Sequence, residues 1–248
     1  MNILVCVARV PDTATRILVG GDGKTIEKQG VKFIVNPYDE FALEEALRLR
    51  EKNGGTVTAV TVGTDANTEV LRTALAMGVD KAILVKGEDA SDSYYVAVNL
   101  AKIAKEINPD LILLGKQSVD FDSLQIPSML GELLDMPSVS VVSGLVVSSG
   151  AITADRDIEG GKEQVSAQLP AIVSAQKGLN EPRYPKLPDI MKAKSKPIET
   201  KDAEAVAART TVLGLEIPSK ARAGKIMDAS DANLDEIVRL LHEEAKVI

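Results

Sequence analysis

Apolar runs alternate with helix-length segments through the first half of the chain. Residues 3–7, 57–62, 82–85 and 111–114 form nearly continuous apolar runs. Runs without regular alternation between apolar and polar positions are typical of strands that are covered on both faces. Because strand and helix patterns alternate, the sequence predicts an α/β fold with a doubly wound, mostly parallel sheet.

The first predicted helix has clear start and stop signals. Asn36 can cap its N-terminus, and Pro37 suits the first helical position. Asp39 and Glu40 favour the positive end of the helix dipole. The Asn-Gly-Gly sequence at 53–55 ends the helix. The pattern therefore predicts a helix that starts at Pro37.

Three more helices are predicted before residue 137. The second runs from about Thr64 or Asp65 to Met77, where Gly78 stops it. The third spans about 91–107, and the fourth begins near Ser123. After Pro137, the short strand-like pieces 144–149, 152–157 and 163–169 predict antiparallel additions to the sheet. Residues 171–175 again resemble a buried strand.

Proline and lysine dominate the stretch 180–201, which predicts an exposed loop rather than a continuous helix. Leu187, Ile190 and Met191 are apolar positions among these charges. Exposed apolar side chains ringed by charge are common at docking sites for proteins, although a solvated loop is the ordinary alternative. The last amphipathic segment, 231–246, predicts a helix that needs a surface to lie on.

Composition excludes several classes of protein. No apolar run in the 248 residues approaches the ~20 residues of a membrane-spanning helix. The net charge of −7 argues against a nucleic-acid partner. With one cysteine, Cys6, and one histidine, His242, the chain is not expected to form an internal disulfide, a His/Cys zinc cluster or a triad that needs a histidine base with a well-placed partner in the core. We expect Cys6 to be a small buried hydrophobe and His242 to be solvated. Since no leader sequence precedes the first strand, we expect a cytoplasmic protein.

The loop after the strand 111–114 is a candidate phosphate site, because ligands bind beyond the carboxyl ends of parallel strands. Gly115 would allow close approach of a ligand, Lys116 offers charge, and Ser118, Ser123 and Gln125 offer polar groups. A loop of capping polar residues is an equally good interpretation, and two acidic side chains in the loop would repel phosphate.

Two other polar groups admit more than one interpretation. Residues 36–39 could contact the base or sugar of a nucleotide, although a plain capped helix is favoured. Asp155, Asp157 and Glu159 alternate along a predicted strand and so share one face. They form either a solvated edge or a docking patch for a basic partner.

The string DRDIEGGKEQVSAQLPAIVSAQKGLNEPRYPKLPDIMKAKSKPI, at residues 155–198, resembles the signature region of electron-transfer flavoprotein beta subunits. The segments VCVARVPD, NPYDEFALEEALRL, LRTALAMGVDKA and LLGKQSVDFD are similar to corresponding family segments. The resemblance covers essentially the whole chain. It implies a Rossmann-like or adenine-nucleotide α-hydrolase-like fold with added antiparallel strands and a C-terminal arm.

Such beta subunits pair with an alpha subunit that carries most of an FAD site, and they bury an AMP. The resemblance implies an AMP site at Cys6, Asn36, Pro37, Tyr38, Asp39, Val62, Gly115, Lys116, Gln117, Ser118, Val119, Asp120, Phe121, Asp122, Ser123, Leu124, Gln125 and Ile126.

The resemblance also assigns roles outside the AMP site. Tyr38 lies where relatives place an aromatic residue near the flavin. Asp157 matches an acid that pairs with an arginine of the mobile flavin domain. Leu187 matches an anchor that inserts into an acyl-CoA dehydrogenase, and Ile190 and Met191 frame it. No metal site and no catalytic residues are implied.

The implied function is to carry electrons from acyl-CoA and related dehydrogenases, through FAD, to a quinone oxidoreductase and the respiratory chain in fatty acid oxidation. We expect a nucleotide-binding core at 1–178, a partner recognition loop at 179–201 and an arm at 202–248 that packs on the alpha subunit. One alternative is an electron-bifurcating subunit with a second FAD in the AMP site, although such relatives generally lack the LNEPRY and IMKAK strings. Another is a free-standing adenine-nucleotide-binding module.

Overall fold

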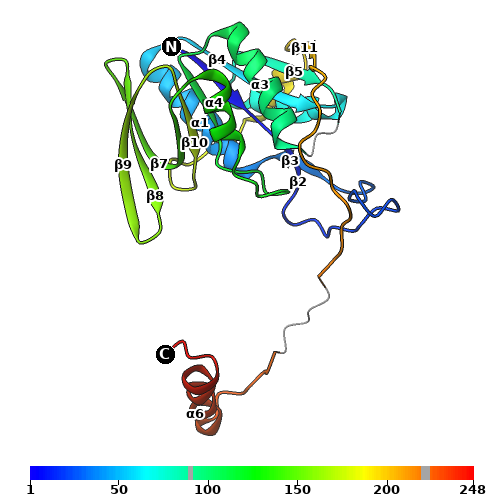
Figure 1. Ribbon diagram of the computed structural model, residues 1–248, viewed down its shortest axis with the longest axis vertical. Coiled ribbons are helices and arrows are strands. Elements are labelled where there is room, and N and C mark those ends of the chain that lie inside the picture. The colour runs from blue at the N-terminus through cyan, green and yellow to red at the C-terminus, as the bar shows by residue number, and fades with distance from the viewer. Residues whose placement is uncertain (89–91, 219–223) are drawn as a thin grey trace. The chain divides into compact units, whose positions relative to one another are not determined.

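The computed structural model describes residues 1–88, 92–218 and 224–248. It divides into two compact units, Met1–Gly214 and Leu215–Ile248. Within the described residues of the first unit, nine strands form one sheet (Figure 1). In spatial order these are β11 (Glu199–Asp202), β5 (Lys81–Lys86), β4 (Thr56–Gly63), β1 (Asn2–Cys6), β6 (Leu111–Gly115), β10 (Ala171–Ala175), β7 (Ser138–Ser148), β8 (Ala151–Ile158) and β9 (Gly161–Gln168).

The sheet is parallel from β11 to β7 and antiparallel from β7 to β9. Both the parallel core and the antiparallel additions are therefore confirmed. β7 begins at Ser138, earlier than the predicted 144, because its first residues pair with β10. A small second sheet joins β2 (Arg9–Pro11) to β3 (Phe33–Val35).

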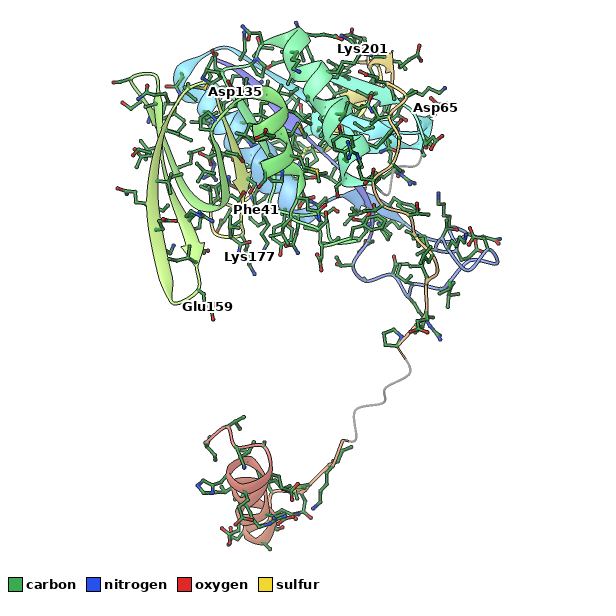
Figure 2. The ribbon with its side chains drawn as sticks, in the orientation of Figure 1. Phe41, Asp65, Asp135, Glu159, Lys177 and Lys201 are labelled. Atoms are coloured by element: carbon green, nitrogen blue, oxygen red, sulfur yellow. The ribbon has the colours of Figure 1, made fainter. Side chains whose placement is uncertain are left out.

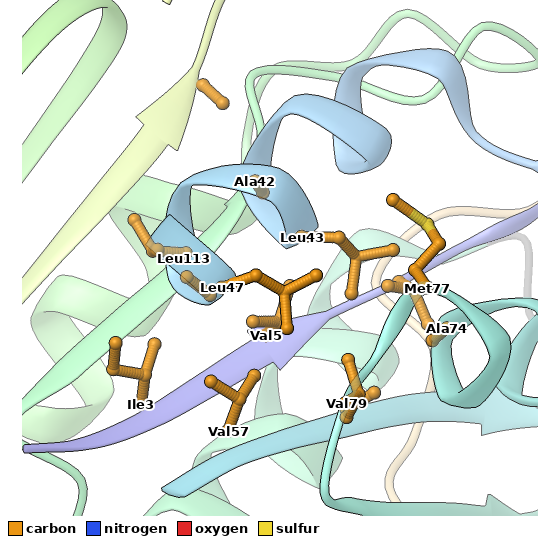
Figure 3. Packing of buried hydrophobic residues seen from close by; sticks show 14 of the residues in the cluster. Ile3, Val5, Ala42, Leu43, Leu47, Val57, Ala74, Met77, Val79 and Leu113 are labelled. Atoms are coloured by element: carbon orange, nitrogen blue, oxygen red, sulfur yellow. The ribbon is translucent and has the colours of Figure 1, made fainter. Parts of the chain in front are cut away.

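Helices cover both faces of the parallel sheet, as predicted. On one face, α1 (Pro37–Asn53) packs on β1 and β6, and α2 (Thr68–Met77) packs on β4 and β5. Figure 3 shows Leu43 and Leu47 of α1 against Val5 of β1. On the other face, α3 (Ser93–Ile107) and α4 (Ile126–Leu134) pack in a second cluster that contains Leu4. Successive residues of β1 thus enter opposite cores, which explains why its sequence is apolar throughout.

The start of α1 at Pro37 is confirmed, but two other helix starts differ from the prediction. A turn of 3₁₀ helix, η1 (Asp65–Asn67), precedes α2. α4 begins at Ile126 rather than near Ser123, because Asp122 and Leu124 have φ values of 51° and 50°, which no right-handed helix accommodates. The predicted start of α3 near residue 91 falls outside the described residues.

The prediction of a loop throughout 180–201 is wrong in two places. Residues Leu187–Ala193 form the short helix α5, in which Pro188 occupies the first turn, where its missing N–H removes no helix bond. Residues Glu199–Asp202 form β11, which pairs with β5 despite its polar sequence.

The second unit contains α6 (Asp231–Arg239), which continues into the π-helical turn η2 (Leu240–Glu244). The predicted helix is thereby confirmed. None of the described residues of these two elements is buried, and His242 is exposed as expected. Within the described ranges, no helix combines the length and apolar character needed to cross a membrane.

Candidate functional site

The strand order reverses at β1, which places a candidate ligand site at one edge of the sheet. From β1 the chain continues to β4 and β5 on one side, and then returns to β6 on the other side. Ligands of open α/β sheets bind at such a switch point, beyond the carboxyl ends of the strands. Cys6, Val62 and Gly115 lie at or next to the carboxyl ends of β1, β4 and β6. The predicted site residues of these strands therefore share this edge.

Asn36 ties the start of α1 to the loop after β6. Its Nδ2 donates a hydrogen bond to the Gln117 carbonyl at 2.9 Å, and its Oδ1 accepts one from the Val119 N–H at 3.2 Å. The predicted side-chain cap of α1 is wrong, because this buried side chain makes no cap hydrogen bond. The side chain of Asn36 instead fixes the shape of the candidate loop.

Asp39 ties the same helix to two strand ends. Its Oδ2 accepts a hydrogen bond from the Ala8 N–H and its Oδ1 accepts one from the Gly115 N–H, each at 2.7 Å. Only 4% of Asp39 is exposed. Burial raises the pKa of Asp39 to about 7 against the lowering effect of these hydrogen bonds, and the charge of Asp120 adds to the increase. The Asp39 carboxyl group thus links the start of α1 to the chain after β1 and to the end of β6.

Gly115 has a packing role that the sequence did not suggest, and close approach of a ligand at this position stays a prediction. A Cβ at this position would lie 2.4 Å from Asp39 Oδ1 and 2.6 Å from Tyr38 Cβ. Its N–H is already bonded to Asp39. Glycine is needed here because the start of α1 packs directly against the end of β6.

The rest of the loop is partly closed by its own hydrogen bonds. Gln117 Nε2 donates to Asp122 Oδ1 at 2.5 Å, and the Asp122 N–H donates to the Ser118 carbonyl at 2.9 Å. Ser123 Oγ lies 3.2 Å from Ser93 Oγ, at the start of α3. These bonds occupy one of the two acidic side chains that would oppose a phosphate, and they attach the loop to a second helix.

Three polar side chains remain available to a ligand at this edge. Within the described residues, the Lys116 ammonium, the Ser118 hydroxyl and the Gln125 side-chain amide make no hydrogen bond. The Lys116 Nζ lies 4.9 Å from the centroid of the Tyr38 ring. Phe121 and Leu124 are exposed. The site therefore offers one cation, several neutral polar groups and apolar contact, beside the exposed carboxylate of Asp120, whose Oδ1 accepts a hydrogen bond from the Phe121 N–H at 3.0 Å.

Cys6 and Val62 have structural surroundings. Cys6 is buried, which confirms the prediction of a small buried hydrophobe, and burial raises the pKa of its thiol. The Val62 carbonyl accepts a hydrogen bond from Asn67 Nδ2 at 3.3 Å. Neither residue offers a reactive group to the site.

The predicted partner-binding residues lie on other elements. Leu187 and Met191, on α5, are 72% and 57% exposed, and Ile190 is 38% exposed. The helix packs on α2 through the buried Ala193. α5 thus presents a small apolar face to solvent.

Asp157 lies on β8, where its Oδ1 accepts a hydrogen bond from Ser143 Oγ at 2.9 Å and pairs with Lys162 Nζ at 3.5 Å. Asp155 accepts a bond from Gln164 Nε2 at 2.9 Å. Glu159 is exposed at the turn between β8 and β9 (Figure 2). Within the described residues, only Asp157 of these three acids thus has a cationic partner, Lys162, whereas Asp155 has a neutral hydrogen-bond donor.

The sequence prediction missed the side chains that hold the α5 segment. Arg183 binds Glu44 and Glu51 of α1, and Arg72 of α2 binds carbonyl groups at the end of α5. The seven-residue spacing of Glu44 and Glu51 places both acids on one side of a helix. This spacing was the signal in the sequence that α1 could bind a basic side chain.

Comparison with known proteins identifies the family. Residues 23–206 match the family described as the electron transfer flavoprotein domain. The electron transfer flavoprotein subunit beta of Bacillus subtilis is 43% identical, and that of Bradyrhizobium diazoefficiens is 42% identical, each over the full length of both chains. The mitochondrial subunit beta of Oryza sativa subsp. japonica is 40% identical over the same extent. The chain therefore belongs to the electron transfer flavoprotein family, and the relatives that it matches over its full length are beta subunits.

Proposed function

We propose that this chain is the beta half of a heterodimeric electron transfer flavoprotein, in which an alpha subunit and this chain together hold FAD. The complex carries electrons from acyl-CoA and related dehydrogenases, in fatty acid oxidation, to a quinone oxidoreductase of the respiratory chain. The observation that carries this proposal is the full-length similarity to proteins named as beta subunits. The exposed apolar face of α5 supports it, because it gives a redox donor a place to dock.

The role of this chain in electron transfer is to bind and orient. FAD supplies the electron-accepting ring when it is bound. Tyr38 offers an aromatic side chain next to the switch-point edge, and Asp157 offers a carboxylate on the antiparallel hairpin for an arginine of the partner. The described residues contain no cluster of side chains that could hold a metal ion. A cytoplasmic complex is the proposed setting.

AMP is the proposed ligand of the switch-point edge, with a structural role. Lys116, Ser118 and Gln125 are the side chains free to meet its phosphate and polar edges, and Asn36 and Asp39 hold the loop that carries them. A ligand that binds only the folded chain stabilises it by mass action. Adding AMP to a nucleotide-stripped complex should therefore raise the Tm, and an unchanged Tm would contradict a structural role.

The proposed division of the chain has a core at 1–178, a recognition segment at 179–201 and an arm at 202–248, each with a single task. The core binds the nucleotide, the segment around α5 docks the dehydrogenase, and the arm packs on the alpha subunit. The exposure of α6 agrees with a surface that is completed by another chain.

Co-expression with the alpha subunit tests the identity of the complex. We expect a yellow heterodimer that releases one FAD and one AMP on denaturation, measured by absorbance and by chromatography of the released nucleotides. Two FAD and no AMP would indicate the electron-bifurcating alternative. A colourless, stable monomer would indicate a free-standing nucleotide-binding module and would overturn the proposal.

The docking role is tested with Leu187→Ala in the heterodimer. We expect slower reduction of the flavin by an acyl-CoA dehydrogenase, with flavin content unchanged. Val146→Ala, which trims another exposed apolar side chain on β7, is the control and should retain the wild-type rate. Equal rates for Leu187→Ala and wild type would remove Leu187 from the docking site.

A further inference from the structure

α5 is too short to hold its own shape. An isolated helix of seven residues is unstable in water, because too few hydrogen bonds offset the cost of nucleation. Ala193 is its only buried residue, and Leu187 and Met191 face solvent. The position of the apolar face must therefore be imposed by contacts at the two ends of the helix.

Arg183 fixes the chain just before α5. Its guanidinium donates to both carboxylates of α1 that face it, with Nε 2.8 Å from Glu44 Oε2 and Nη1 2.6 Å from Glu51 Oε1. Nη2 adds a 3.2 Å bond to each acid, and the Arg183 N–H donates to Glu44 Oε2 at 3.1 Å. Planar, two-sided bonding of this kind fixes direction as well as distance.

The acid at the centre of this contact is buried. The Glu44 side chain is only 4% exposed, and Arg48 Nε donates to its Oε1 at 2.7 Å. Burial alone raises the pKa of Glu44, but the bonds from Arg183 and Arg48 outweigh it, and the net pKa is lowered. Removing Arg183 therefore costs more than a surface ion pair would, because a buried carboxylate loses its main partner.

Asn180 provides a second attachment to α1. Its Nδ2 donates to Glu45 Oε2 at 2.9 Å and to the Phe41 carbonyl at 3.0 Å. Arg48 Nη2 also reaches the Glu181 carbonyl at 3.2 Å. The segment 180–183 thus lies along α1 through several side chains.

Arg72 fixes the other end of α5. Its Nη1 donates to the Ala193 carbonyl at 2.7 Å and to the Lys196 carbonyl. Lys196 Nζ in turn donates to the Val79 carbonyl at 3.2 Å. Carbonyl groups at a helix C-terminus have no partner within the helix, so a cation placed there stabilises the helix end.

We propose that Arg183 and Arg72 are positioning residues that set the orientation of α5 before a partner binds, and so raise the affinity of the complex for its electron donor. The inference rests on the proposed function, because it takes the donor dehydrogenase as the partner of α5. A docking element that is ordered in advance loses less conformational entropy on binding. Their loss should weaken docking and leave the transfer step itself unchanged.

The test uses the heterodimer with Arg183→Met and, separately, Arg72→Met. Turnover of an acyl-CoA dehydrogenase is measured against increasing concentrations of each complex. We expect the KM for the complex to rise about tenfold, equivalent to about 1.4 kcal/mol, with kcat within twofold of wild type. Arg183→Lys keeps the charge but cannot bridge two acids, so it should give an intermediate KM.

Arg50→Met is the matched control. Arg50 lies on α1, the helix that Arg183 contacts, and pairs with Asp80 Oδ1 at 2.9 Å, but it makes no bond to the segment 180–196 within the described residues. Its KM should match wild type. A rise in KM equal to that of Arg183→Met would show that general loosening of α1 is responsible, and would overturn the inference.

Amide hydrogen exchange separates this inference from the proposed function. Exchange at 187–193 should be at least tenfold faster in Arg183→Met and Arg72→Met than in wild type or Arg50→Met. Unchanged exchange would overturn the positioning role, and faster exchange with an unchanged KM would overturn its link to docking. If the wild-type complex accepts electrons from no dehydrogenase, the proposed function fails. The rate of amide exchange at 187–193 would still show whether Arg183 and Arg72 fix the position of α5.

Discussion

The loop edge around Gly115 and the short helix α5 are held by different kinds of contact. At the loop edge, buried polar groups connect α1 to the ends of β1 and β6, and the contacts are part of the core. At α5, charged side chains hold the two ends while the apolar residues between them face solvent. The shape of the proposed ligand site is therefore linked to folding stability at the first region, whereas the exposed apolar residues of α5 contribute little to folding stability.

The largest expected effect is a change of stability with pH caused by Asp39. Its pKa is raised to about 7 in the folded chain from 3.8, so between these values the folded state binds more protons than the unfolded state. Stability is therefore highest below about pH 4 for this group and falls as pH rises through about 7, by about 4 kcal/mol in total. Asp39→Asn should remove this component.

The measurement for Asp39 is denaturant unfolding of both proteins between pH 4 and pH 8. The difference in unfolding free energy between wild type and variant should change between about pH 4 and pH 7 and level off above about pH 7. A constant difference at all pH values would show that the carboxyl group does not titrate there.

Gly115→Ala comes next in size. Its Cβ would meet the Asp39 carboxylate and the backbone of Tyr38, so α1 must move away from β6. We expect a loss of about 3 kcal/mol of unfolding free energy, together with weaker AMP binding. Gly161→Ala, on β9, is the control, because no atom lies within 4 Å of its added Cβ. Equal stability of the two variants would refute the account of packing at Gly115.

Asn36→Ala should have a smaller effect, about 1–2 kcal/mol, because two hydrogen bonds to the loop are lost from a buried side chain. The same change should speed amide exchange at Val119, whose N–H loses its acceptor. Protection at Val119 equal to that of wild type would show that the loop is held by other contacts.

Leu187→Ala should change the unfolding free energy by less than about 0.5 kcal/mol, because the side chain is 72% exposed. Thermal unfolding of the purified chain gives the measurement. A loss of 2 kcal/mol or more would mean that Leu187 supports the fold, and the contrast with the loop edge would disappear.

The parallel core could be predicted from the sequence because each of its strands and helices is marked by residues within the element or next to it. The strand at 111–114 is a run of four large apolar residues, and α1 is bounded by Pro37 and by the glycines after Asn53. Burial on both faces leaves such strands apolar throughout, so their positions can be recognised without knowledge of the fold.

What the sequence could not show depends on contacts between distant segments. The side chain of Asn36 has the right type for a helix cap, but it bonds instead to Gln117 and Val119, which are 81 and 83 positions further along the chain. β11 carries no apolar run, and it is a strand because the edge of β5 pairs with it. Similarly, the role of Gly115 is set by Tyr38 and Asp39, which only the folded chain brings against it.

α1 carries at its start the residues that shape the loop edge, and along its length the acids that receive Arg183. A graft of residues 180–196 from another beta subunit would thus need compatible side chains at 44 and 51 of the recipient. If the segment alone were transplanted, its arginine would lack the two carboxylates that Arg183 binds here, those of Glu44 and Glu51. If the proposed docking role holds, the unit to exchange for changing donor preference is this segment together with α1.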